Sequence, residues 1–315
     1  MAKIEQISMT TPTLIPPKRT AMSAQKRREA ITAYLFLLPT IIGFMLFVLG
    51  PMLGAIGLSF FDWNLLSTPE FSGTANYQAL LHDIRLGTIF LSTLKIAFST
   101  VFLNVLLGLC FAVLLEQKMP NLFRQFFRLS YFFPFVVSVS AVALIWTFLM
   151  NKDLGIINYY LGLIGIERIG WLSSSRWAPV SVVIIAVWKS LGFNVLVFLG
   201  GLQTIPKDLY DAAEVDGAGG WSQFRHITLP LLSPTTFFLI VINLINAFQI
   251  FAEPYILTQG GPGDASRPIV MYIYEQGFRF FNLGYASTVA LVLFVIILLL
   301  TLLQFKLSER WTFYQ

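Results

Sequence analysis

Long stretches without a charged side chain constrain this chain more than any other feature of its sequence. Asp, Glu, Lys and Arg are absent from residues 30–61, 96–115, 129–151, 177–188, 190–206, 227–252 and 280–305. A helix needs about 20 apolar residues to cross the hydrocarbon core of a bilayer, and several of these stretches are longer. Hydrophobic residues make up 56% of the chain, against roughly 45–50% in soluble domains. A soluble fold could not bury so much apolar surface, so the sequence predicts an integral membrane protein.

The apolar stretches predict an all-α membrane protein with six spans. We place the spans at about residues 34–60, 92–115, 131–150, 179–202, 232–257 and 285–305. Residues 1–32 are polar and basic, contain three prolines and show no apolar periodicity, which is typical of a flexible tail. The remaining residues, 33–315, are expected to form one transmembrane domain in contact with lipid.

The distribution of basic residues predicts which side of the membrane each loop faces. With the N-terminus in the cytoplasm, cytoplasmic segments hold thirteen of the 21 Lys and Arg residues and outer segments hold six, while Lys95 and Lys189 lie inside spans. Basic residues are enriched in cytoplasmic loops. We therefore expect a multi-pass inner-membrane protein with both termini in the cytoplasm, which places the loop at residues 203–231 on the cytoplasmic side.

The chain lacks the residue patterns of a catalyst. Cys110 lies alone in a span, and His82 and His226 are isolated in loops, so neither a metal-ligand cluster nor a nucleophile with its base is predicted. The sequence contains no GxxxxGK(S/T) phosphate loop. The basic residues form no stripe of the kind that binds nucleic acid. We expect no catalytic residue, cofactor or metal on this chain.

The cytoplasmic loop contains the stretch DAAEVDGAGG, residues 211–220, in which charged and small residues are concentrated. Pro206 and Asp208 favour a helix start and Gly217 favours a helix end, so a helix-turn-helix is predicted. One slim face of the first helix would carry Leu209, Ala212, Ala213 and Asp216. A helix face without bulky side chains can fit closely into a groove on another protein. Alternatively, the small residues let the loop pack against its own membrane domain.

The loop resembles the EAA loop of ABC-importer permeases in residue type and spacing. The matching positions are Asp211, Ala212, Ala213, Gly217, Ile227, Leu229 and Pro230, with Asp211 in place of the usual Glu. The segments NVLLGLCFAVLL, RLSYFFPFVVS, WKSLGFNVLVFLGGLQTIP and FAEPYILTQGGPG are also similar to carbohydrate-importer permeases of the maltose and glycerol-3-phosphate type. By this resemblance the chain is identified as a member of that permease family.

The resemblance implies a role for the loop and a set of partners. In such permeases the EAA loop is a coupling helix that docks in a groove of a cytoplasmic ATPase, where its acidic residue pairs with an arginine. That role falls here to Asp211, and the neighbouring contact residues are Ala212, Ala213, Gly217, Leu209 and Glu214. The implied assembly contains a second related permease, two ATP-binding-cassette ATPases that hold ATP and Mg, and an extracytoplasmic substrate-binding protein.

Polar residues inside the predicted spans are candidates for the substrate pathway, because polar groups are costly in lipid. The candidates are Asn243, Asn246, Gln249 and Glu253 on one face of the fifth span, Tyr255 nearby, and Lys189 and Asn194 in the fourth span. Amide and carboxylate groups suit the hydroxyls of a sugar or polyol, and a buried cation would also suit a phosphorylated polyol. Alternatively, the amides bind neighbouring helices and Lys189 is paired for structural reasons, with Glu253 as one candidate partner.

These observations predict a permease subunit of an ATP-driven, binding-protein-dependent importer for a sugar or related polyol. Two other classes stay open. A secondary transporter would also have six spans and buried polar residues, but it would draw on an ion gradient and need no docking loop. A non-transporting membrane scaffold would use the loop as a general interaction site.

Overall fold

The computed structural model describes residues 24–116 and 120–312. The chain divides into two compact units, Met1–Gly54 and Ala55–Gln315. The N-terminal elements are helix α1 (Ala24–Phe44), the π-helical segment η1 (Met45–Leu49) and helix α2 (Gly50–Leu58). Together they make a helical stretch over Lys26–Leu58 that is long and apolar enough to cross a membrane.

The N-terminal helix begins earlier than the sequence predicts. Residues 24–32 were expected in the flexible tail, but they belong to α1, and their sequence AQKRREAIT is rich in the good helix formers Ala, Gln, Lys, Arg and Glu. Residues 1–23, the rest of the predicted tail, lie outside the described residues.

The second unit consists almost entirely of helices in its described part. Its long helices are α4 (Ile84–Glu116), α8 (Trp177–Gln203), α12 (Ser233–Phe248) and α15 (Leu283–Ser308). Its shorter helices are α3 (Ala75–His82), α5 (Asn121–Val136), α6 (Val139–Leu149), α7 (Ile156–Leu163), α9 (Lys207–Val215), α10 (Gly220–Gln223), α11 (Leu229–Leu231), α13 (Ala252–Leu257) and α14 (Ile269–Tyr274). The π-helical segments η2 (Phe224–Thr228) and η3 (Glu275–Arg279) and one antiparallel pair of strands, β1 (Phe61–Asp62) and β2 (Glu70–Phe71), complete it.

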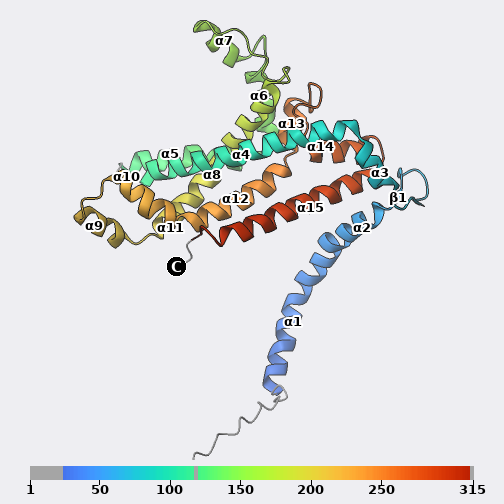
Figure 1. The fold of residues 1–315 in the computed structure, drawn as a ribbon, viewed down its shortest axis with the longest axis horizontal. Helices are drawn as coiled ribbons and strands as arrows, with labels where there is room; N and C mark the ends of the chain where they lie inside the picture. The colour runs from blue at the N-terminus through green and yellow to red at the C-terminus, as the bar shows by residue number, and fades with distance from the viewer. Residues whose placement is uncertain (1–23, 117–119, 313–315) are drawn as a thin grey trace, which may run out of the picture. The chain divides into compact units, whose positions relative to one another are not determined.

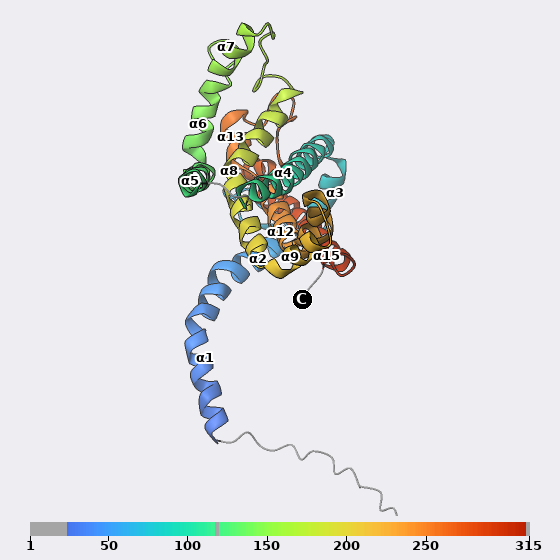
Figure 2. The ribbon, with the colours of Figure 1, turned by 90° about the vertical axis from the view of Figure 1, so that its left-hand side faces the viewer.

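Helices α4 and α8 lie side by side at the centre of the second unit (Figures 1 and 2). Ser190 Oγ donates to Asn104 Oδ1 at 3.0 Å. One turn further along both helices, a Cβ added at Gly108 would come within 2.8 Å of the Asn194 Cβ, so the glycine permits the close approach. Because both contacts advance together along the two helices, α4 and α8 run in the same direction.

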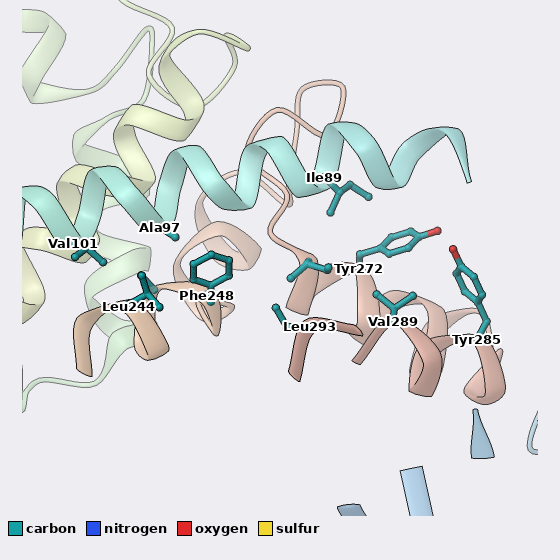
Figure 3. Close-up of a cluster of buried hydrophobic side chains, with 11 residues drawn as sticks. Ile89, Ala97, Val101, Leu244, Phe248, Tyr272, Tyr285, Val289 and Leu293 are labelled. Atoms are coloured by element: carbon teal, nitrogen blue, oxygen red, sulfur yellow. The ribbon is translucent and has the colours of Figure 1, made fainter. Parts of the chain in front are cut away.

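A second packed region joins α4, α12, α14 and α15 (Figure 3). Ile89, Phe248 and Val289 are fully buried there. The side chains of Tyr272 and Tyr285 lie at one end of this region with their hydroxyl groups near each other, and their ring centroids are 6.4 Å apart. This packing attaches α14 and the start of α15 to the first half of α4.

The third predicted span, residues 131–150, is not one straight helix. Helix α5 ends at Val136, α6 begins at Val139, and the two are bent by 106°. Val137 and Ser138 between them have extended backbone, with ψ values of 143° and 129°. Pro134 lies in the last turn of α5, where its missing N–H removes a helical hydrogen bond. At about 1.5 Å a residue, neither helix reaches the roughly 30 Å that a span requires.

The predicted all-α membrane fold is confirmed. Among the described residues, five helices are long and apolar enough to cross a membrane, and the number rises to six if the bent pair α5 and α6 counts as one span. Helix α8 covers Trp177–Gln203 where a span over 179–202 was predicted. Helix α4 starts at Ile84, eight residues before the predicted start at 92.

Candidate functional site

Three asparagines form a buried polar network between the central helices. Asn104 of α4 and Asn194 of α8 both donate to Asn243 Oδ1 of α12, at 3.0 and 3.4 Å. Asn243 Nδ2 in turn donates to Asn194 Oδ1 at 2.6 Å. All three residues are at most 6% exposed. Because buried amides that satisfy one another rigidify a packed core, this network holds α4, α8 and α12 together.

A cavity of about 420 Å³ lies beside this network. The structure brings five of the seven predicted pathway residues to its walls, namely Lys189, Asn243, Asn246, Gln249 and Glu253. It does not bring Asn194 or Tyr255 there. Asn194 is fully buried in the asparagine network, so for this amide the alternative of binding neighbouring helices applies. The ring of Tyr255 stacks on Phe251, with centroids 5.1 Å apart.

Lys189 binds the backbone at the bend between α5 and α6. Its Nζ donates to the carbonyl oxygens of Val137, at 3.0 Å, and Phe135, at 3.3 Å. Carbonyls at the end of a helix lack an intrahelical partner, so the ammonium group satisfies oxygens that the bend exposes. Glu253 lines the same cavity, but no ion pair joins it to Lys189 within the described chain. Backbone carbonyls, and not the suggested Glu253, are therefore the partners of Lys189.

The cavity also contains residues that were not predicted from the sequence. Phe135 and Phe193 line it and stack on each other, with ring centroids 5.6 Å apart and an interplanar angle of 19°. Asn104 and Ser190 line it as well. Asn104 could have been found, because it is a polar group inside a predicted span. Phe135 could not, because its place at the cavity depends on the bend.

The fifth predicted span is interrupted beside the cavity. Helix α12 ends at Phe248 and α13 begins at Ala252. The break brings Gln249 and Phe251 to the cavity wall. Non-helical backbone is tolerated at membrane depth where it lines a cavity. The cavity therefore explains how the fifth span can be interrupted at this point.

The predicted coupling residues lie on α9, except for Gly217, which follows its end; α9 stands at one end of the second unit (Figure 1). Asp211, Ala212, Glu214, Leu209 and Gly217 are exposed and Ala213 is half-buried. Tyr210 packs against the buried cluster formed mainly by α4, α8 and α12, and its hydroxyl lies 2.9 Å from Thr228 Oγ1 of η2. Ala212 is exposed and accessible to another protein, whereas Ala213 is half-buried.

Gly217 ends α9 in the way that its residue type predicts. Its φ of +78° lies in the left-handed region, which favours glycine. The Gly217 N–H donates to the Glu214 carbonyl at 3.0 Å, and the Ala218 N–H donates to the Ala213 carbonyl at 2.8 Å. These two bonds form a Schellman motif. The glycine therefore stops the helix and turns the chain back toward α10.

A charged cluster attaches the loop before α14 to the first turn of α4. Asp264 accepts two hydrogen bonds from Arg85, at 2.9 and 3.0 Å, and pairs with Arg267 Nε at 2.7 Å. Arg267 also pairs with Glu275. The bond from Arg85 holds the pKa of Asp264 below its ordinary value of 3.8, although burial opposes this.

The neighbouring Asp83 accepts hydrogen bonds from the hydroxyls of Tyr272 and Tyr285. Burial raises the pKa of Asp83, but hydrogen bonds from the two tyrosine hydroxyls and from the backbone N–H groups of Arg85 and Leu86 together hold it below 3.8. Burial and the bond to Asp83 raise the pKa of Tyr272 to about 12. Both carboxyl groups are therefore ionised, and the Tyr272 phenol is neutral, throughout the neutral range.

We expect this charged cluster to make stability depend on acid pH. A carboxyl group whose pKa is lowered by folding contributes stability that is present above the unfolded value near 3.8, and is lost as pH falls through the lower folded value. Asp264→Asn should therefore lower the melting temperature at pH 7 by a few degrees, and the difference from wild type should shrink below about pH 4. Thermal unfolding of the purified protein at a series of pH values measures both effects.

The matched control is Asp62→Asn, which removes an exposed carboxylate that makes no ion pair in the described part of the chain. It should leave the melting temperature at pH 7 unchanged. An Asp264→Asn protein that melts like wild type at pH 7 would contradict the role given to the cluster.

Comparison with known proteins places this architecture in one family. Residues 104–313 match the family described as binding-protein-dependent transport system inner membrane component. The probable ABC transporter permease YurN of Bacillus subtilis (strain 168) is 37% identical over 282 residues, which cover 89% of this chain and 96% of that protein. The arabinooligosaccharides transport system permease AraP of the same organism is 33% identical over 277 residues, covering 87% and 88%.

A solved structure shows the same fold. A chain in the crystal structure of a bacterial ABC transporter involved in the import of the acidic polysaccharide alginate aligns with a TM-score of 0.80 and 25% identity. The alignment covers 91% of this chain and 98% of that one.

The helices, the interrupted spans and the cavity define a multi-pass permease of the inner membrane. The chain belongs to the family of binding-protein-dependent transport system inner membrane components, so the resemblance predicted from its sequence is confirmed. It is the membrane subunit of an ABC transporter and not a catalyst, because ATP is hydrolysed on a separate chain.

Proposed function

We propose that this chain is the permease subunit of an ATP-driven importer for a sugar or related polyol. The observation that carries the proposal is the cavity, where amide, carboxylate and ammonium groups lie beside the stacked rings of Phe135 and Phe193. A few polar groups among aromatic side chains suit a ligand with many hydroxyls. The relative described as a permease for arabinooligosaccharides supports the same substrate class.

The charges in the cavity favour a neutral ligand over a phosphorylated one. Lys189 uses two of its three donors on backbone carbonyls. Glu253 places a carboxylate in the same cavity. A phosphate group would compete with those carbonyls for the ammonium, whereas the hydroxyls of a neutral sugar can donate to Glu253. A phosphorylated polyol is therefore the second candidate.

The exposed helix α9 supports the role of coupling helix. Asp211 would pair with an arginine in a groove of the ATPase, and the other contacts would come from Ala212, Ala213, Gly217, Leu209 and Glu214. In this proposal α9 and both termini lie in the cytoplasm, in agreement with the distribution of basic residues. The assembly would comprise a second related permease, two ATPase subunits with ATP and Mg, and an extracytoplasmic substrate-binding protein.

The chain connects α9 to the cavity through a run of short helices. Helices α10 and α11 and the segment η2 lead directly into α12, which ends beside Gln249. Closure of the ATPases would displace α9, and this run would carry the displacement to Asn246 and Gln249 in the cavity wall. The coupling is mechanical, because ATP binds on another chain.

We expect Gln249→Ala to lower the apparent affinity of the transporter for its sugar, measured by uptake. The exposed amide of Gln249 lines the cavity, and each lost hydrogen bond costs about 0.5–1.5 kcal/mol, which corresponds to roughly a two- to tenfold loss in apparent affinity. Uptake of labelled sugars into proteoliposomes, with the ATPase and binding protein supplied, measures this effect.

The matched control is Gln78→Ala, which removes the same side chain from an exposed position on α3, away from the cavity. Uptake by this variant should be unchanged. Equal loss in both variants would contradict the assignment of Gln249. Uptake driven by an ion gradient without the ATPase would favour a secondary transporter, and an assembled complex that takes up no sugar would favour a scaffold.

A further inference from the structure

A second groove of about 550 Å³ lies between α4 and α8, and no residue of the candidate site lines it. Most of its walls are apolar, with Leu103 on α4 and Val180, Val183 and Ile184 on α8. Two cationic residues, Lys95 and Arg176, also line it. It contains no acidic residue.

Neither cation has an acidic partner in the described part of the chain. Lys95 is exposed and makes no hydrogen bond or ion pair there. The guanidinium of Arg176 lies 5.7 Å from the centroid of the Trp177 ring, and it also makes no ion pair among these residues. A cation within an apolar span is costly unless an anion or water reaches it.

The groove reaches the level of the lipid headgroups. Helix α8 begins at Trp177, directly after Arg176, and its 27 residues make a length of about 40 Å. The hydrocarbon core is about 30 Å thick, so α8 extends beyond it, and the predicted span over 179–202 leaves Arg176 and Trp177 outside the span. Lys95 lines the same groove as Arg176, and a lysine stem can follow apolar surface while its ammonium reaches the polar layer. The anions available at this level are lipid phosphates.

We propose that this groove binds one anionic phospholipid, with the headgroup between Lys95 and Arg176 and an acyl chain along Val180, Val183 and Ile184. Charge complementarity selects the lipid class. A choline headgroup would bring a third positive charge to the two cations, whereas a glycerol headgroup leaves the phosphate with a net negative charge. A single acyl chain fits the apolar walls of the groove. In the proposed orientation, this lipid belongs to the outer leaflet of the inner membrane.

The test uses the complete transporter in nanodiscs that contain equal amounts of phosphatidylglycerol and phosphatidylcholine. After detergent extraction, native mass spectrometry counts the lipids that remain bound. We expect wild type to retain phosphatidylglycerol in preference to phosphatidylcholine. The double variant Lys95→Gln with Arg176→Gln should lose about tenfold or more of this enrichment, since each basic residue near the headgroups contributes a severalfold preference for anionic lipid.

Two further variants show whether the effect comes from the two cations of the groove, from a change in the fold, or from binding of the acyl chain. The matched control, Lys152→Gln with Arg279→Gln, removes two exposed cations outside the groove and should keep the enrichment. Val180→Trp keeps both cations but fills the groove at a position that is 39% exposed, so it should reduce retention of phosphatidylglycerol.

Four results would overturn the proposal. The double variant could retain phosphatidylglycerol as wild type does, or wild type could retain the two lipids equally. The double variant could also lose the second permease while wild type keeps it, which would show that a protein carboxylate, and not a lipid phosphate, pairs with these cations. Free glycerol phosphate should not displace the lipid, and displacement at millimolar concentration would identify a site for a soluble anion instead.

Discussion

Asp211→Lys is expected to abolish ATP-driven uptake, the largest functional effect of any single substitution on this chain. In the proposed complex Asp211 is the acidic residue of α9 that pairs with an arginine of the ATPase, and the structure leaves it exposed for that contact. Lysine would replace attraction by repulsion inside the docked interface. Breaking a buried ion pair from one side costs about 3–5 kcal/mol, which corresponds to a loss of more than about a hundredfold in binding. ATP-driven uptake measures the loss of transport, and co-purification of the ATPase measures the loss of binding.

The two control substitutions also replace an acidic residue. Asp211→Glu restores the residue that is usual in the family's loop and should keep both uptake and assembly. Glu309→Lys makes the same charge reversal at an exposed position beyond the end of α15 and should also be tolerated. Normal transport by Asp211→Lys would exclude Asp211 from the coupling contact.

Gly192→Ala is expected to have a large effect on the fold. A Cβ at residue 192 would lie 2.0 Å from the Tyr131 carbonyl oxygen and 3.0 Å from the Phe132 Cα. Both obstacles are backbone atoms, so no side-chain rotation relieves them and α5 must move away from α8. Overpacking of this kind costs about 1–3 kcal/mol and sometimes more. We expect a melting temperature several degrees lower in detergent, together with reduced uptake, because the movement also displaces the carbonyls that Lys189 binds.

Gly200→Ala on the same helix is the matched control. A Cβ at Gly200 meets no atom within 4 Å and the residue is exposed. Alanine favours helix over glycine by about 1 kcal/mol, so this variant should be as stable as wild type or more stable. If the two variants melt at the same temperature, the close approach of α5 to Gly192 does not exist in the protein.

The sequence was informative where a feature depends on a short segment alone. The apolar run that became α8 starts and ends within two residues of the predicted span, because length and hydropathy decide whether a helix can cross lipid. Gly217 likewise acts as predicted, because a left-handed helix end favours glycine in any surroundings. Both features follow from residue type and spacing.

The candidate site was predictable only in part. Asn246, Gln249 and Glu253 were found because polar residues inside an apolar run are conspicuous, and all three line the cavity. Asn194 has the same appearance in the sequence but is fully buried among other amides. Which amide faces the cavity depends on how α8 and α12 pack, and periodicity within one helix does not contain that information.

The sequence by itself determined the membrane class, the approximate spans, the permease family and the residues of the exposed helix α9. Only the tertiary structure decided the bend between α5 and α6 and the partners of Lys189. The run at 131–150 is uncharged and mostly apolar, so hydropathy indicates a straight span. The bend depends on atoms distant in sequence. Gly192 leaves room for the backbone of Tyr131, and the Lys189 ammonium donates hydrogen bonds to the carbonyls of Phe135 and Val137. Those contacts arise only when α8 packs against α5.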